Sequence, residues 1–208
     1  MLITCKNLTT EYRLEWDRAI RHPFLAECKS ASITPAQFNT WLVQDYLFVT
    51  EFARMAGRLL SVAPVKHMDT LLGGIGALKD ELIWFVEKAQ ERALDLCTAT
   101  QKAGADYRKF MASLGSEPYA AQAVAFWAIE AAYNQAWRKP GPMSPPYDEF
   151  AVRWGSENFG EYVAALENQA NEALFEGGSD SQARAKHVFR TVAELENRFW
   201  DMAYQVTA

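Results

Sequence analysis

Apolar residues along most of the chain recur at spacings of three, four and seven, which is the periodicity of an α-helix with one buried face. The alternation of apolar and polar residues that is typical of a strand is almost absent. Proline, glycine and capping residues divide the pattern into eight segments. We predict helices over about residues 9–21, 35–61, 65–103, 106–113, 118–138, 147–154, 157–175 and 181–204. The chain is therefore expected to be all-α, a single-domain helical bundle over residues 1–208 with ligand space between facing helices.

Local signals mark several helix ends. Thr34 is placed to cap the second predicted helix, with Pro35 at its first position. The pair Gly73-Gly74 is expected to break or bend the third helix. The stretch KPGPMSPP, with four prolines in eight residues, should be irregular, and Gly177-Gly178 should end the seventh helix.

Composition and charge narrow the class of partner. Half of the 208 residues are hydrophobic and 13% are aromatic, which suits a packed interior or a ring-binding pocket. A net charge of −5 without a basic run argues against nucleic acid or an anionic membrane as a partner. We expect no membrane helix, because no long apolar run is free of charge. The N-terminal residues lack the apolar core of a signal peptide, so a cytoplasmic protein is expected.

Cysteines and histidines give no pattern of a metal or redox site. Cys5, Cys28 and Cys97 include no CxxC pair and are odd in number, so neither a disulfide framework nor a cysteine zinc site is expected. No glutamate lies three residues before any of the three histidines, as a ferritin-like di-iron site requires. His22 precedes a proline and is expected at the surface or at a helix end. We therefore predict no metal and no cofactor, and nothing specific supports a haem ligand.

Three carboxylates, Asp45, Glu130 and Glu196, lie on helix faces that are otherwise apolar. Glu194, two residues before Glu196, instead shares its face with Arg190 and other polar residues. The apolar neighbours are Trp41, Leu42, Phe48, Val49 and Phe52 for Asp45, Ala123, Phe126, Trp127, Tyr133 and Trp137 for Glu130, and Phe189, Val192, Phe199, Trp200 and Ala203 for Glu196. We predict that the first three point into the core and that Glu194 faces solvent.

Burying an isolated ionised carboxylate is costly, so each of the three must be paired, hydrogen-bonded or protonated. A structural explanation is that Tyr, Trp or Arg side chains satisfy each of them. Three together favour a functional explanation, because active sites bury carboxylates in order to shift their pKa values. The aromatic residues on the same faces are mostly expected in the core, although a few could face a flat heterocycle.

Six short segments follow one another along the chain: His22-Pro23-Phe24, WLVQDYLFV at 41–49, LKDE at 78–81, FWAIE at 126–130, Arg153-Trp154-Gly155 and LENRFW at 195–200. Together they resemble the TenA (thiaminase II) family. The resemblance is closest to the branch that lacks the catalytic cysteine, because residues 119–137 hold no cysteine and carry FWAIEAxY with Glu130 in it. It implies a haem-oxygenase-like helical fold without haem and hydrolysis of an aminomethylpyrimidine, or its N-formyl form, to hydroxymethylpyrimidine for thiamin synthesis.

The same resemblance implies roles for individual residues. Asp45 matches the aspartate that holds the aminopyrimidine edge, and Glu196 matches the acidic residue used as general acid or base. We therefore predict Glu196, Glu130 and Asp45 as catalytic residues. The substrate-binding set is predicted to be Asp45, Phe48, Tyr107, Tyr133 and Trp154.

The function expected from the sequence is a cysteine-independent hydrolase of thiamin pyrimidine salvage, acting on a small-molecule pyrimidine. A homo-oligomer, dimer or tetramer, is expected. The first alternative is a non-catalytic pyrimidine-binding or regulatory protein on the same fold. The second is a haem or di-iron oxygenase of similar architecture, which the histidine spacing disfavours.

Overall fold

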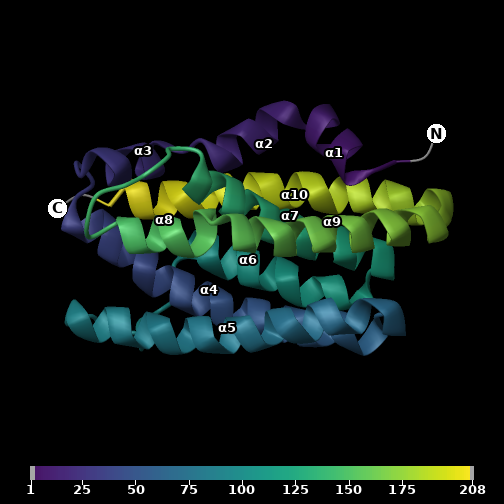
Figure 1. Ribbon diagram of the computed structural model, residues 1–208, viewed down its shortest axis with the longest axis horizontal. Helices are drawn as coiled ribbons and strands as arrows, with labels where there is room; N and C mark the ends of the chain where they lie inside the picture. Colours follow the sequence, from purple (N-terminus) through teal and green to yellow (C-terminus); the bar gives the residue numbers. More distant parts are fainter. Residues whose placement is uncertain (1–2, 207–208) are drawn as a thin grey trace. The chain divides into compact units, whose positions relative to one another are not determined.

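A computed structural model describes residues 3–206, which form ten α-helices, a short 3₁₀ helix and no strand (Figure 1). The all-α prediction is therefore confirmed. The helices are α1 (Cys5–Glu11), α2 (Arg13–Ile20), α3 (Pro23–Ser30), α4 (Pro35–Val62), α5 (Val65–Glu91), α6 (Lys102–Ser113), η1 (Leu114–Ser116), α7 (Tyr119–Arg138), α8 (Asp148–Gly155), α9 (Glu157–Glu176) and α10 (Gly178–Tyr204).

Several predicted helix ends are confirmed. The side chain of Thr34 accepts a hydrogen bond from the backbone of Gln37, whose side chain returns to the backbone of Thr34, and Pro35 begins α4. The proline-rich stretch at 139–146 lies between α7 and α8, outside any helix. Helix α9 ends at Glu176, directly before Gly177.

The N-terminal region differs from the prediction. The single helix expected over residues 9–21 is two helices, because the backbone of Tyr12 leaves the helical conformation (φ −106°, ψ 36°). Pro23 was expected to follow a helix and instead occupies the first position of α3, where its missing N–H is not needed. The Nδ1 atom of His22 caps this helix by accepting a hydrogen bond from the backbone of Phe24 at 3.2 Å. His22 is thus a helix-end residue, but it is buried.

The third predicted helix is also wrong in its extent. Helix α5 continues through Gly73-Gly74 and ends at Glu91, residues 92–101 form a loop, and α6 begins at Lys102. A glycine inside a helix costs roughly 1 kcal/mol relative to alanine. The buried face of α5, which carries Leu71, Leu78 and Phe85, packs against α4 and outweighs that cost.

The described residues group into two compact units. The first holds residues 3–33 and 117–200, with α7 packed against α2, α8 and α9. Seventeen of the twenty residues of α7 are buried, so this helix is covered on all sides. Figure 1 shows α9 alongside α7 within this unit.

The second unit holds residues 34–116 and 201–206, and in it α4 packs against both α5 and α6. The last residues of the chain join this unit through the side chain of Gln37, which donates to the carbonyl of Tyr204. A single domain over residues 1–208 stays a prediction.

Candidate functional site

The burial predicted for three carboxylates is confirmed. The exposed fraction is 1% for Asp45, 8% for Glu130 and 3% for Glu196. The side chain of Glu194 is 41% exposed and pairs with Arg190 at 3.1 Å, as its solvated face predicted. Helix periodicity therefore separates two glutamates that lie two residues apart.

In the first unit, two pairs of stacked rings align α7 with α10. The ring centroids of Trp127 and Phe189 lie 5.9 Å apart, and those of Tyr133 and Trp200 lie 5.8 Å apart at an interplanar angle of 13°. Residue numbers rise together along the two helices at these contacts, so α7 and α10 run in the same direction.

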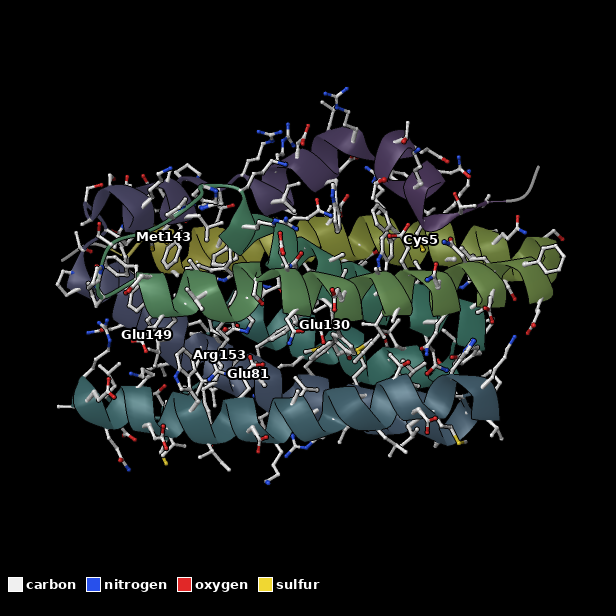
Figure 2. The ribbon with its side chains drawn as sticks, viewed as in Figure 1. Cys5, Glu81, Glu130, Met143, Glu149 and Arg153 are labelled. Carbon is white, nitrogen blue, oxygen red and sulfur yellow. The ribbon has the colours of Figure 1, made fainter. Side chains whose placement is uncertain are left out.

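Glu130 and Glu196 both lie between these two aromatic contacts, one on each helix. Glu130 is midway between Trp127 and Tyr133, and Glu196 lies one turn before Trp200. The two buried carboxylates are thus placed along the same stretch of the α7–α10 contact. Figure 2 labels Glu130 on α7.

Two predicted substrate-binding aromatics meet in the same unit. The rings of Tyr133 and Trp154 contact edge to face, with centroids 5.1 Å apart at 81°. The side chain of Asn134, which is buried, donates to the carbonyl of Trp154 at 2.7 Å and so joins α7 to the end of α8. Gly155 permits this approach, because a Cβ atom there would lie 3.1 Å from the backbone of Arg138.

The second unit brings together the other three predicted residues. Asp45 and Phe48 lie three residues apart on α4 and so share a face of the helix. The ring of Phe48 meets the ring of Tyr107 on α6 at 4.8 Å in an edge-to-face contact. Tyr107 is 1% exposed. An acidic group and two rings therefore stand on neighbouring turns of two packed helices.

Two buried polar residues beside this group were missed. Gln44 accepts a hydrogen bond from the backbone N–H of Gln101 at 2.8 Å and donates to the carbonyl of Ala99 at 3.2 Å. Glu51 accepts hydrogen bonds from Arg54 at 3.1 Å and from Arg58 at 2.9 Å.

The electrostatics of Glu51 follow from these contacts. Burial raises the pKa of its carboxyl group, and the hydrogen bonds and charges of Arg58 and Arg54 outweigh burial, so the pKa lies below the usual range. Glu51 is therefore ionised at neutral pH. Its mixed neighbours in the sequence, Phe48 and Met55 on one side and the two arginines on the other, gave no clear signal of burial.

Metal-binding groups and reactive thiols have less support in the described residues. Residues 3–206 contain no group of three or more His, Cys, Asp and Glu side chains arranged to hold a metal ion. Cys5 and Cys28 are buried, and burial together with the charge of Glu167 raises the pKa of the Cys5 thiol well above its usual range. In the same stretch, none of the helices combines the length and the apolar character that crossing a membrane requires.

Comparisons with known proteins agree with this architecture. A Glycine max protein named "Probable bifunctional TENA-E protein" is 34% identical over 205 residues, covering 93% of this chain and 90% of the relative. An aminopyrimidine aminohydrolase of Halalkalibacterium halodurans is 27% identical over 201 residues, covering 91% of this chain and 90% of the relative.

The X-ray structure of a TenA homologue from Pyrococcus furiosus superposes with a TM-score of 0.91 at 32% identity, covering 96% of this chain and 98% of the homologue. The haem-oxygenase-like fold expected from the resemblance is thereby confirmed. Residues 10–206 match the TENA/THI-4/PQQC family, and this chain belongs to that family.

Proposed function

We propose that this protein is a hydrolase of thiamin pyrimidine salvage, which converts an aminomethylpyrimidine, or its N-formyl derivative, to hydroxymethylpyrimidine. The observation that carries the proposal is the placement of Glu130 and Glu196, both buried between the two stacked aromatic contacts of α7 and α10. Three relatives named aminopyrimidine aminohydrolase, at 21–27% identity, support the reaction class.

The proposed reaction replaces a carbon–nitrogen bond by a carbon–oxygen bond. One glutamate, protonated, gives its proton to the departing amine, which leaves as ammonia. The other, ionised, removes a proton from the water that attacks the exocyclic methylene carbon. The division rests on the general rule that two carboxyl groups sharing an apolar pocket repel one another, so that one stays protonated while the other ionises. With the N-formyl substrate, the same pair would first direct water at the formyl carbon.

Recognition of the ring is assigned to the other predicted residues. Asp45 is proposed to accept a hydrogen bond from the exocyclic amino group and a second from the adjacent ring nitrogen when that nitrogen is protonated, since a carboxylate offers two acceptors to such an edge. Phe48, Tyr107, Tyr133 and Trp154 are proposed to contact the ring, and an aromatic pair typically contributes about 0.5–1.5 kcal/mol beyond its buried area.

We further propose that the reaction uses no cysteine nucleophile. The cysteines at 5, 28 and 97 all lie outside α7, and two of them are buried. Carboxylate catalysis would assign the chain to the cysteine-lacking branch of the family, and the absence of cysteine from residues 119–137 supports this assignment. A homo-oligomer and a cytoplasmic location stay predictions.

The decisive experiment is multiple turnover by purified protein with aminomethylpyrimidine, its N-formyl derivative and thiamin, detecting hydroxymethylpyrimidine by mass. We expect turnover of the first or second substrate and little of thiamin. Glu130→Gln and Glu196→Gln should each lower kcat by about 10²–10⁴-fold, the range for general acid–base groups.

The matched control is Glu194→Gln, which changes an exposed glutamate on the same helix as Glu196. It should retain wild-type turnover. Wild-type rates in both Glu130→Gln and Glu196→Gln would remove the mechanism. Tight binding of the pyrimidines without turnover would instead favour a non-catalytic pyrimidine-binding protein.

A further inference from the structure

Helix α6 is fastened to α4 at both of its ends, within the second unit. At the N-terminal end, the side chain of Gln44 accepts from the backbone of Gln101, the N-cap residue of α6, at 2.8 Å. The same side chain donates to the carbonyl of Ala99 at 3.2 Å. Gln44 therefore uses both its acceptor and its donor to hold the entry to α6.

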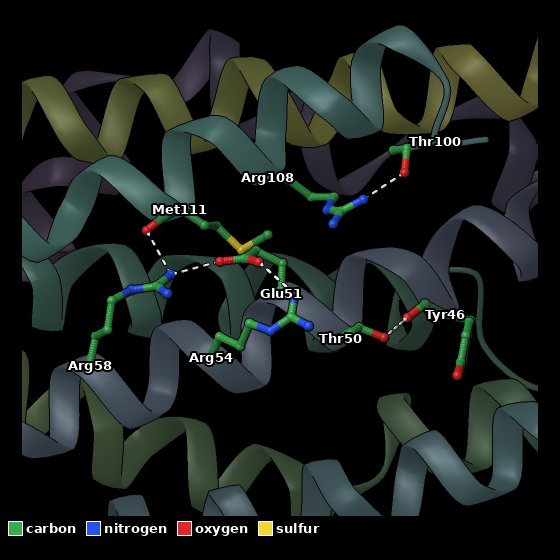
Figure 3. A network of polar contacts seen from close by, with 8 residues as sticks. All are labelled: Tyr46, Thr50, Glu51, Arg54, Arg58, Thr100, Arg108 and Met111. Carbon is green, nitrogen blue, oxygen red and sulfur yellow. Dashed lines mark hydrogen bonds and ion pairs between the residues drawn. The ribbon is translucent and has the colours of Figure 1, made fainter. Parts of the chain in front are cut away.

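At the C-terminal end, a guanidinium bridges the two helices (Figure 3). The Nη2 atom of Arg58 donates to the carbonyl of Met111 on α6 at 3.3 Å and to Glu51 at 2.9 Å. The last four carbonyls of a helix lack partners within the helix, so the carbonyl oxygen of Met111, in the last turn of α6, can accept a hydrogen bond from outside it. A cation also suits the negative end of the helix dipole. Glu51 holds the guanidinium in place, and its own side chain is only 11% exposed.

The aromatic contact of the candidate site lies between these two attachments. Phe48 lies between Gln44 and Glu51 along α4, and Tyr107 lies between Gln101 and Met111 along α6. Because both ends are held by hydrogen bonds, which weaken steeply with distance and angle, α6 cannot slide or rotate on α4 without breaking one of them.

We propose that Gln44 and the Glu51–Arg58 pair are positioning residues that hold the ring of Tyr107 against the ring of Phe48 and so set how tightly the site binds its flat substrate. The link to substrate rests on the proposed function. The helix placement does not, and it can be tested without any ligand.

The first test is ligand-free NMR, in which the nuclear Overhauser effect between the ring protons of Phe48 and Tyr107 reports the 4.8 Å contact. Glu51→Gln keeps the size of the side chain and removes its charge, and Gln44→Leu removes the other attachment. We expect each variant to weaken the signal and the pair together to abolish it. Arg58→Lys, which retains the charge with less directional donors, should keep part of it.

The second test separates KM from kcat with aminomethylpyrimidine. Loss of a charged hydrogen bond changes an equilibrium by roughly tenfold, so Glu51→Gln should raise KM by about that factor. The kcat should stay within roughly twofold, since Glu51 is not assigned to the chemistry. Arg58→Lys should raise KM by less than Glu51→Gln does. The matched control is Asp80→Asn, which removes an exposed ion pair with Lys79 on α5 and should leave both parameters unchanged.

Each outcome decides one step. An unchanged Overhauser effect in both Glu51→Gln and Gln44→Leu would overturn the positioning role. A weakened effect with an unchanged KM would overturn the link to substrate binding. If Glu51→Gln does not fold, Arg58→Lys and Gln44→Leu decide the question by the same readouts. If the wild-type protein turns over no pyrimidine, the proposed function fails, and the Overhauser data still decide whether the attachments position Tyr107.

Discussion

The two units hold their predicted site residues by different kinds of contact. In the first unit, Tyr133 touches Trp154 and Trp200 ring against ring, and the rings are buried. In the second, the contact between Phe48 and Tyr107 is flanked by the polar attachments made by Gln44 and by the Glu51–Arg58 pair.

The difference indicates which kind of change should destabilise each unit. Apolar packing is roughly proportional to buried area and depends little on pH, so the first unit should respond mainly to lost volume. Directional polar contacts define position more than they add stability, so the second unit should respond to lost charge and to pH.

The largest effect is expected from removing volume in the first unit. Trp154→Ala deletes a ring that is 2% exposed and contacts Tyr133, and truncating a buried tryptophan costs about 3–5 kcal/mol. Chemical denaturation should show that loss in the free energy of unfolding. Val152→Ala, on the same helix but 71% exposed, should change it by less than about 0.5 kcal/mol. A cost below about 1 kcal/mol for Trp154→Ala would contradict the comparison.

A smaller effect is expected from removing the side chain of Asn134, which links α7 to the end of α8. Asn134→Ala leaves the carbonyl of Trp154 without its donor, and a buried group left unsatisfied costs about 1–3 kcal/mol. Asn168→Ala, at an exposed position of α9, is the control. Equal free energies of unfolding for the two variants would show that the rings alone fix α8 on α7.

How far the sequence predicts these features depends on the range of the interaction. The capping box at Thr34 is formed by residues three apart, so local pattern was enough to predict it. The burial of Asp45, Glu130 and Glu196 could be predicted because each stands among apolar residues of its own helix. Tyr12 offered no proline or glycine to mark the break between α1 and α2.

Contacts between distant parts of the chain could not be predicted in the same way. Gln44 is explained by Ala99 and Gln101, which lie more than fifty residues further along, and Arg58 by the carbonyl of Met111. A helix periodicity contains no information about such partners. Glu51 was missed because its neighbours on α4 are mixed, apolar on one side and arginine on the other, so the sequence pattern gave no clear signal of burial.

A pH-dependent effect of intermediate size is expected in the second unit. Because Arg58 and Arg54 hold the pKa of Glu51 below its usual range, ionised Glu51 stabilises the fold above the ordinary carboxyl pKa. That contribution is lost as the pH falls through the lowered pKa. At neutral pH, Glu51→Gln should cost about 1 kcal/mol, and the difference from wild type should shrink towards acid.

The measurement is the free energy of unfolding as a function of pH for both proteins, together with hydrogen exchange of the α6 amides. Asp80→Asn, in an exposed pair with Lys79, should run parallel to wild type across the range. If wild type and Glu51→Gln also run parallel, the attachment at Met111 does not depend on the charge of Glu51.

The smallest effect on stability, and the sharpest contrast between the units, is expected from the thiols. Cys97, exposed in the loop before α6, should react at once with a thiol reagent, and Cys97→Ser should change the free energy of unfolding by less than about 0.5 kcal/mol. Cys5 and Cys28 belong to the first unit and are fully buried, and burial with the charge of Glu167 raises the pKa of Cys5. Both should react only when that unit opens, so their labelling rate in Trp154→Ala should rise while that in Glu51→Gln stays close to wild type.

Turnover should survive modification of Cys97, because the proposed chemistry needs carboxylates only. Faster labelling of Cys5 in Glu51→Gln would mean that the two units unfold together. The contrast between apolar packing and polar attachment would then hold for the contacts within each unit, but the units would not differ in stability.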